Sequence, residues 1–83
     1  MDSRRVLIID THEQDVKILQ RILETAGYQV AVAVNSDEGI RLAQDLYPEV
    51  VLLAIQSPGL NGLQILQQLK KRGTTRNLPV LIL

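Results

Sequence analysis

The chain has 83 residues, 46% of them hydrophobic and none of them cysteine, so we expect a single domain, residues 1–83, without disulfides or thiolate metal sites. Nine Lys and Arg residues balance nine Asp and Glu residues, which gives no argument for binding nucleic acid or a membrane surface. No apolar run approaches the roughly 20 residues that span a membrane, and the N-terminus lacks the apolar core of a secretory signal, so we expect a soluble cytoplasmic protein.

Two short apolar runs, with an amphipathic stretch between them, open the chain. Residues 6–10 are too few for a helix and rich in branched side chains, which is typical of a buried strand ending at Asp10. From Glu13 onward, apolar side chains recur at helical spacing until Gly27, a residue type that commonly ends helices. Residues 29–34 then alternate larger and smaller side chains, so we expect a second strand near a sheet edge.

A second helix and the most apolar strand follow. Ser36 is a good N-cap, acidic residues fill the first turn behind it, and Pro48 ends the helix. Residues 49–55 are apolar after Glu49 and show no alternation, as expected of a parallel strand that is covered on both faces. The Ser, Pro, Gly and Asn residues gathered in positions 57–62 predict a loop.

The last predicted helix and strand lie in a segment without acidic residues. Asn61, with Gln64 three residues later, resembles a capping box at the start of a helix. The apolar face of that helix is predicted to consist of Leu63, Leu66 and Leu69. Residues 79–83 are apolar and predict a fourth strand. All nine acids lie in residues 1–49 with five bases, whereas residues 50–83 hold four bases, so the charge is unevenly divided along the chain.

Strands and helices thus alternate strictly, which indicates an α/β fold built on a parallel four-stranded sheet, β-α-β-α-β-α-β. Right-handed crossovers limit the topology, and we expect the strand order 2-1-3-4 with the first helix on one face and the other two on the opposite face. In such a sheet, ligands bind at the carboxyl ends of the strands where the winding reverses. Those ends bring together Asp10 and Thr11 after the first strand with Ala54 and Ile55 after the third.

The sequence resembles the receiver domain of two-component response regulators, a CheY-like domain with a flavodoxin-like fold. The resemblance is carried, in order and at the family's spacing, by residues 6–10, 22–30, 48–53, 57–63 and 78–82. It implies a signalling domain rather than an enzyme. Because a complete receiver has five strands, it also implies a domain that is truncated after its fourth strand.

The resemblance further implies where a phosphorylation site would stand. The family places two adjacent acids after the first strand and a phospho-accepting aspartate after the third, and these acids hold Mg²⁺. Here Asp10 keeps the first acidic place, Thr11 stands in the second, and Ala54 stands in that of the acceptor. The family's Thr or Ser and its Lys would lie beyond Leu83. We therefore expect no catalytic residue, no metal and no cofactor, with Asp10 and Thr11 as a relic of the acidic pocket.

Other residues near the predicted site have simpler interpretations. Pro58, Gly59 and Gly62 match the family in the loop after the third strand, and we expect them to shape that loop. His12 is expected to be an exposed loop residue, because Asp10 beside it gives too few ligands for a transition metal. The hydroxyl groups of Ser57 and Thr11 are alternative sites of phosphorylation.

Two functions remain open. In the first, the chain is a phosphorylation-incompetent pseudo-receiver that acts by protein association, as a homodimer or on a histidine kinase or another receiver. In the second, it is an N-terminal fragment, or an engineered form with phosphorylation blocked, of an ordinary receiver from a larger response regulator. Thr11 beside Ala54 favours the first, since a designed block needs only one change. The association surface is predicted at the open fourth strand. It comprises Val80, Leu81, Ile82 and Leu83.

Overall fold

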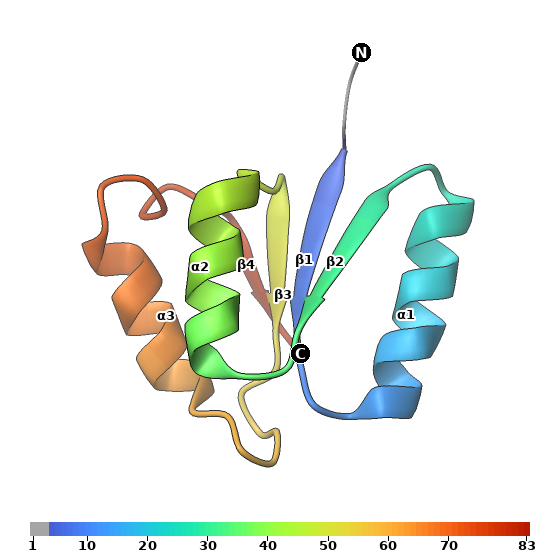
Figure 1. The fold of residues 1–83 in the computed structure, drawn as a ribbon, viewed down its shortest axis with the longest axis horizontal. Coiled ribbons are helices and arrows are strands. Elements are labelled where there is room, and N and C mark those ends of the chain that lie inside the picture. The colour runs from blue at the N-terminus through green and yellow to red at the C-terminus, as the bar shows by residue number, and fades with distance from the viewer. Residues whose placement is uncertain (1–3) are drawn as a thin grey trace.

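The computed structural model describes residues 4–83 and contains seven elements that alternate along the chain (Figure 1). They are β1 (Arg5–Ile9), α1 (Glu13–Thr25), β2 (Gln29–Ala33), α2 (Ser36–Leu46), β3 (Val50–Leu53), α3 (Gly62–Lys71) and β4 (Val80–Ile82). All strand pairs are parallel, and the sheet has the order β2-β1-β3-β4. The predicted fold class and strand order are confirmed.

Side chains of β1 alternate between two apolar layers, because successive residues of a strand point to opposite faces of a sheet. Leu7 and Ile9 are fully buried in the layer that α2 and α3 cover. Val6 and Ile8 are buried on the other face, together with Val16 of α1. Figure 1 shows α2 and α3 together on the β4 side of the sheet, while α1 stands alone beyond β2. The predicted division of the helices between the two faces is therefore confirmed.

Three strands are shorter than the apolar runs that predicted them. The run 49–55, for example, contains a strand only over β3, Val50–Leu53, and the next two residues already belong to the loop that leads to α3. An apolar side chain can be buried at the end of a strand whose backbone has already left the sheet, so hydrophobicity alone overestimates strand length.

The sequence predicted polar N-caps for α2 and α3, and only the cap of α3 is the predicted residue. Asn61 caps α3 as predicted, since its side chain accepts a hydrogen bond from the backbone N–H of Gln64 at 3.1 Å. The cap of α2 is Asn35 rather than Ser36, and Asn35 Oδ1 accepts from the backbone N–H of Glu38 at 2.8 Å. The prediction of Ser36 was wrong because two adjacent residues of good capping type cannot be ranked by type alone.

The apolar face of α3 also differs from the prediction by part of a turn. Ile65 and Leu69 are fully buried, whereas Leu63 is 60% exposed. The buried side follows Gly62 at the start of the helix, which faces the end of β3, and positions three and seven residues later share its direction. The prediction was therefore right for Leu69, and for Leu66, which packs partly buried against the same core, but wrong for Leu63, and it missed Ile65.

β4 forms one edge of the sheet. It is joined to β3 through the carbonyl of Pro79 and the N–H of Leu83, each in a hydrogen bond of 2.9 Å. Since alternate residues of a strand direct their backbone groups to opposite sides, those of Val80 and Ile82 point away from β3. Among residues 4–83, no helix is long and apolar enough to cross a membrane.

Candidate functional site

The ends of β1 and β3 lie side by side because the two strands pair in register, with Ile9 opposite Leu53. The next residue of each strand, Asp10 and Ala54, continues this alignment, and the N–H of Ala54 donates to the carbonyl of Ile9 at 3.0 Å. On the other side, the N–H of Asp10 donates to the carbonyl of Ala33 in β2 at 3.1 Å. Asp10 and Ala54 are each only 4% exposed. The sheet thus places a buried carboxyl group beside a buried methyl group.

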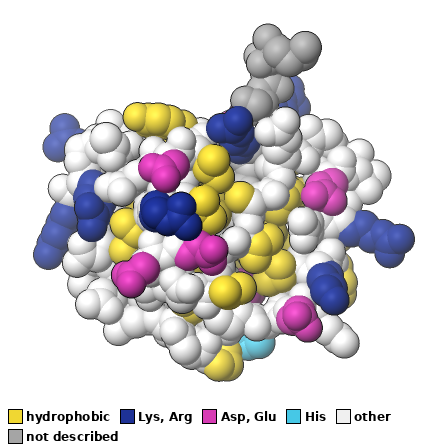
Figure 2. Space-filling view, viewed as in Figure 1, with side chains coloured by type: hydrophobic (Ala, Val, Ile, Leu, Met, Phe, Trp, Pro, Cys, Tyr) yellow, Lys and Arg dark blue, Asp and Glu magenta, His cyan; other side chains and the backbone are white. Residues whose placement is uncertain are grey.

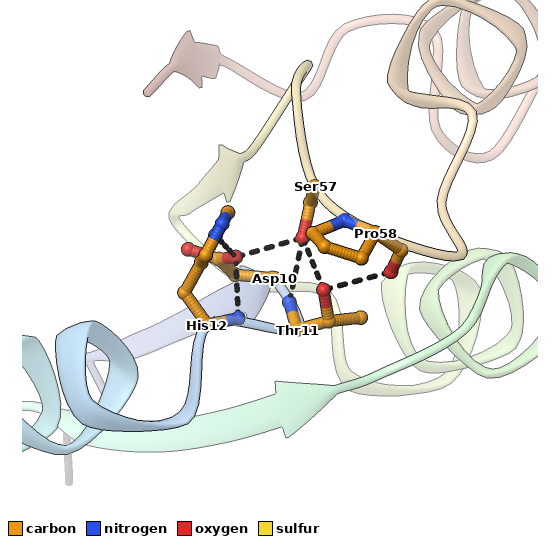
Figure 3. A network of polar contacts seen from close by, with 5 residues as sticks. All are labelled: Asp10, Thr11, His12, Ser57 and Pro58. Atoms are coloured by element: carbon orange, nitrogen blue, oxygen red, sulfur yellow. Dashed lines mark hydrogen bonds and ion pairs between the residues drawn. The ribbon is translucent and has the colours of Figure 1, made fainter.

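One oxygen of Asp10 is the centre of a polar network (Figure 3). Asp10 Oδ1 accepts from the backbone N–H of His12 at 2.9 Å and lies 2.8 Å from Nδ1 of the same residue. It also accepts from the hydroxyl of Ser57 at 3.0 Å, across the loop that follows β3. His12 is partly exposed as predicted, and a histidine is visible at the surface where the strands end (Figure 2). The sequence suggested a pair with Asp10 only as two metal ligands, whereas the structure joins the two residues by hydrogen bonds.

Opposing effects set the ionisation of Asp10. Burial raises the pKa of a carboxyl group, because the charged form loses its hydration. The hydrogen bonds from the backbone and ring of His12 and from the hydroxyl of Ser57 act in the other direction and hold the pKa of Asp10 below its ordinary value. Asp10 is therefore ionised at neutral pH, and these donors within the protein stabilise its charge at Oδ1.

Thr11 connects the same loop to the end of β1. Its backbone N–H donates to Ser57 Oγ at 2.9 Å, and its own hydroxyl lies 2.5 Å from that oxygen. The hydroxyl of Thr11 also donates to the carbonyl of Pro58 at 2.8 Å. Asp10, Thr11, His12, Ser57 and Pro58 form what we call the Ser57 network. It fastens the β1–α1 loop, residues 10–12, to the β3–α3 loop, residues 54–61.

Two glycines determine the path of the β3–α3 loop. Gly59 has φ of +78°, in the left-handed region that side chains with a Cβ rarely adopt. A Cβ on Gly62 would lie 2.7 Å from the carbonyl oxygen of Ala54 and 2.7 Å from Cα of Ile55, so the start of α3 can approach β3 this closely only with glycine. Pro58 contributes its carbonyl to the Ser57 network.

The role of Ser57 was missed from the sequence. It was considered only as a modification site, whereas the structure leaves it 7% exposed with its hydroxyl directed at Asp10 and Thr11. The sequence feature that could have indicated this role is a small hydroxyl residue in the β3–α3 loop, opposite the single buried acid Asp10. That signal becomes useful only once the two strand ends are known to be adjacent.

The comparisons with known proteins agree with this geometry. Residues 6–83 match the response regulator receiver domain. The chain belongs to this family. The receiver domain is 42% identical over 78 residues to protein PilH of Pseudomonas aeruginosa, a match that covers 94% of this chain and 64% of PilH. It is 31% identical over 81 residues to response regulator PleD of Caulobacter vibrioides, covering 98% of this chain and 18% of PleD.

A solved structure shares the same architecture. The N-terminal domain of a response regulator receiver protein from Methanoculleus marisnigri has a TM-score of 0.87 and 28% identity, over 94% of this chain and 63% of that one. The receiver domain therefore spans somewhat less than two thirds of this structure and of PilH. Family membership establishes a signalling module of two-component systems.

The residues of this receiver domain do not fit the divalent cation that the resemblance implies. Mg²⁺ needs near-octahedral oxygen coordination, commonly with carboxylates. Asp10 supplies the only carboxylate of the Ser57 network, and its Oδ1 already has three hydrogen-bonding contacts. Across residues 4–83, no group of three or more His, Cys, Asp or Glu side chains is placed to hold a metal ion.

Proposed function

We propose that this receiver domain does not accept a phosphoryl group and that it acts in two-component signalling by binding other proteins. The observation that carries the proposal is Ala54, which follows β3 beside Asp10 at the place where the resemblance puts the acceptor. A methyl group has no lone pair with which to attack phosphorus, so an acyl phosphate cannot form there. The proposal includes a single domain and a cytoplasmic location, which suits a chain without cysteine.

A second defect supports the same proposal independently. Phosphoryl transfer depends on a metal ion that neutralises charge developing on the transferred group. Thr11 contributes no carboxylate, and its hydroxyl is held by Ser57 and Pro58. The charge of Asp10 is likewise held by His12 and Ser57. Both the acceptor and the second acidic ligand are therefore lacking, and one oxygen of the remaining acid is already engaged.

Treatment with a small phosphoryl donor tests this proposal directly. After incubation with acetyl phosphate and Mg²⁺, the intact mass of the protein should remain unchanged, because no carboxylate stands in the acceptor place. An increase by one phosphoryl group would overturn the proposal. Peptide mapping would then assign the group, since a phosphoester at Ser57 or Thr11 survives treatment with neutral hydroxylamine, which cleaves an acyl phosphate.

The association surface that we propose lies on β4. Leu81 is 58% exposed, and Ile82 and Leu83 are each about half exposed. Outward-pointing backbone groups of Val80 and Ile82 make the same strand a template for pairing with another strand. Pro79 immediately precedes the strand and directs its carbonyl toward β3, so its missing N–H does not protect the outer edge. We propose that a second copy pairs here across a two-fold axis, and that a histidine kinase or another receiver is the alternative partner.

Replacing Leu81 by lysine is expected to abolish the dimer, because a charged side chain would be buried at its centre. Size-exclusion chromatography with light scattering at micromolar concentration should give a dimer for the wild type and a monomer for Leu81→Lys. Leu63→Lys is a matched control, since Leu63 is 60% exposed but lies on α3. A monomeric wild type, or a dimer that only Leu63→Lys dissociates, would contradict the proposal.

The alternative function is that of a part of a larger response regulator. The receiver domain spans 64% of PilH and 18% of PleD, so it is also compatible with being part of a larger response regulator. In that case further residues of the same chain, rather than a second copy, would cover β4. If Ala54 is moreover an introduced block of phosphorylation, restoring one aspartate at that position should be sufficient for phosphoryl uptake.

A further inference from the structure

The hydroxyl of Ser57 holds a central position at the edge of the sheet. It donates to Asp10 Oδ1, accepts from the N–H of Thr11 and contacts the hydroxyl of Thr11, at 3.0, 2.9 and 2.5 Å. These partners are separated from Ser57 by 46 or 47 residues in the chain. Figure 3 shows the hydroxyl reaching from the β3–α3 loop toward both residues that follow β1. One buried side chain thus connects two loops that the sheet only brings near each other.

We propose that Ser57 is a clamp that holds the β1–α1 and β3–α3 loops in one conformation without a metal ion or a phosphoryl group. The inference rests on the proposed function, because a receiver that is never phosphorylated keeps a fixed signalling surface only if its own side chains fix these loops. A positioning role of this kind fits a residue that is only 7% exposed and meets three polar groups.

The two hydroxyl groups of the Ser57 network have two protons for three contacts. Asp10 is ionised and the carbonyl of Pro58 has no proton, so both ends of the hydroxyl chain can only accept. The Ser57 proton serves Asp10 and the Thr11 proton serves Pro58, so the contact between the two hydroxyl oxygens depends on sharing one of them.

The two hydroxyl groups are therefore unequal in what their removal would break. Loss of the Ser57 hydroxyl leaves the N–H of Thr11 without its acceptor and Asp10 without one donor. Loss of the Thr11 hydroxyl leaves both of those hydrogen bonds in place. We therefore expect a graded response, with the larger effect at position 57.

Amide hydrogen exchange measured by NMR tests the clamp. In Ser57→Ala, exchange of the Thr11 amide and of amides in the β3–α3 loop should accelerate by about tenfold, which corresponds to the loss of one hydrogen bond. Thr11→Val should accelerate exchange less, and Gln56→Ala, an exposed neighbour on the same loop, should leave it unchanged. Ser57→Cys retains a weak donor and should fall between wild type and Ser57→Ala, and it serves if the alanine variant does not fold.

A second readout separates the clamp from general loosening. The pKa of Asp10, followed by its carboxyl NMR resonance, should rise in Ser57→Ala because the ionised form loses a donor. Unchanged exchange, or an unchanged pKa, in the variants at position 57 would overturn the clamp. Phosphoryl uptake by the wild type would instead overturn the proposed function and leave the exchange result standing, so the two failures are distinguishable.

Discussion

Replacing Gly62 by alanine is expected to lower the free energy of unfolding by about 3 kcal/mol. The added Cβ would lie 2.7 Å from both the carbonyl oxygen of Ala54 and Cα of Ile55. These are backbone atoms at the end of β3, and they are held by the pairing of β3 with β1, so neither can move without disturbing the sheet. Urea denaturation at neutral pH measures the change.

Gly39→Ala is the matched control for this substitution. A Cβ on Gly39 would lie 2.9 Å from Cδ1 and 3.3 Å from Cγ1 and Cγ2 of Ile9, which are atoms of a buried side chain and not of the backbone. Gly39 is also inside α2, where alanine is favoured over glycine by about 1 kcal/mol. We expect this variant to remain within about 1 kcal/mol of wild type. Equal destabilisation by both substitutions would show that the contact of Gly62 with the strand end is not the cause.

Restoring two carboxylates, by Thr11→Asp together with Ala54→Asp, is expected to create a Mg²⁺ site. With Asp10, the variant would have three carboxyl groups at the ends of β1 and β3. Their mutual repulsion should lower stability in the absence of metal, and Mg²⁺ should restore it, because a ligand that binds only the folded state stabilises it. A Mg²⁺ concentration one hundred times the dissociation constant would contribute about 2.7 kcal/mol.

Thermal unfolding with and without MgCl₂ measures this effect. The melting temperature of the double variant should rise with Mg²⁺. That of the wild type should change only as much as an equal increase in ionic strength from another salt changes it. The single variants, Thr11→Asp and Ala54→Asp, are the controls and should respond less. If Ala54→Asp alone bound Mg²⁺ as tightly as the double variant, Thr11 would not be a defect, and the alternative of a blocked ordinary receiver would be favoured.

The main features of the fold could be predicted from the sequence because they depend on patterns that local chemistry imposes. The unbroken apolar runs at β1 and β3 required burial on both faces, which is what a central parallel strand provides. The helix cap of α2 and the buried face of α3 could not be predicted, because neighbouring residues of similar type fit each position equally well. Asn35 and Ser36 are both good caps, and the leucine spacing of α3 did not reveal that Ile65 rather than Leu63 is buried against the sheet.

The candidate site was predictable only as a set of positions. Asp10, Thr11 and Ala54 follow from the strand order and from the resemblance to the receiver family, since both place the strand ends together. Whether the hydroxyl of Ser57 reaches Asp10 depends on the path of a loop and on one rotamer, and 47 residues separate the two in sequence. Sequence periodicity contains no information about such a contact.

The central position of β1 has a consequence for the order in which the protein assembles during synthesis. β1 is the first strand of the chain, yet it pairs on one side with β2 and on the other with β3. The β2 side can close as soon as Ala33 has left the ribosome, whereas the other side waits for Val50. At about 5–20 residues per second, the nascent chain carries one unpaired apolar strand edge for roughly one to three seconds. Because β1 stays half-paired until β3 has emerged, the domain is exposed to mispairing at its own centre while translation continues.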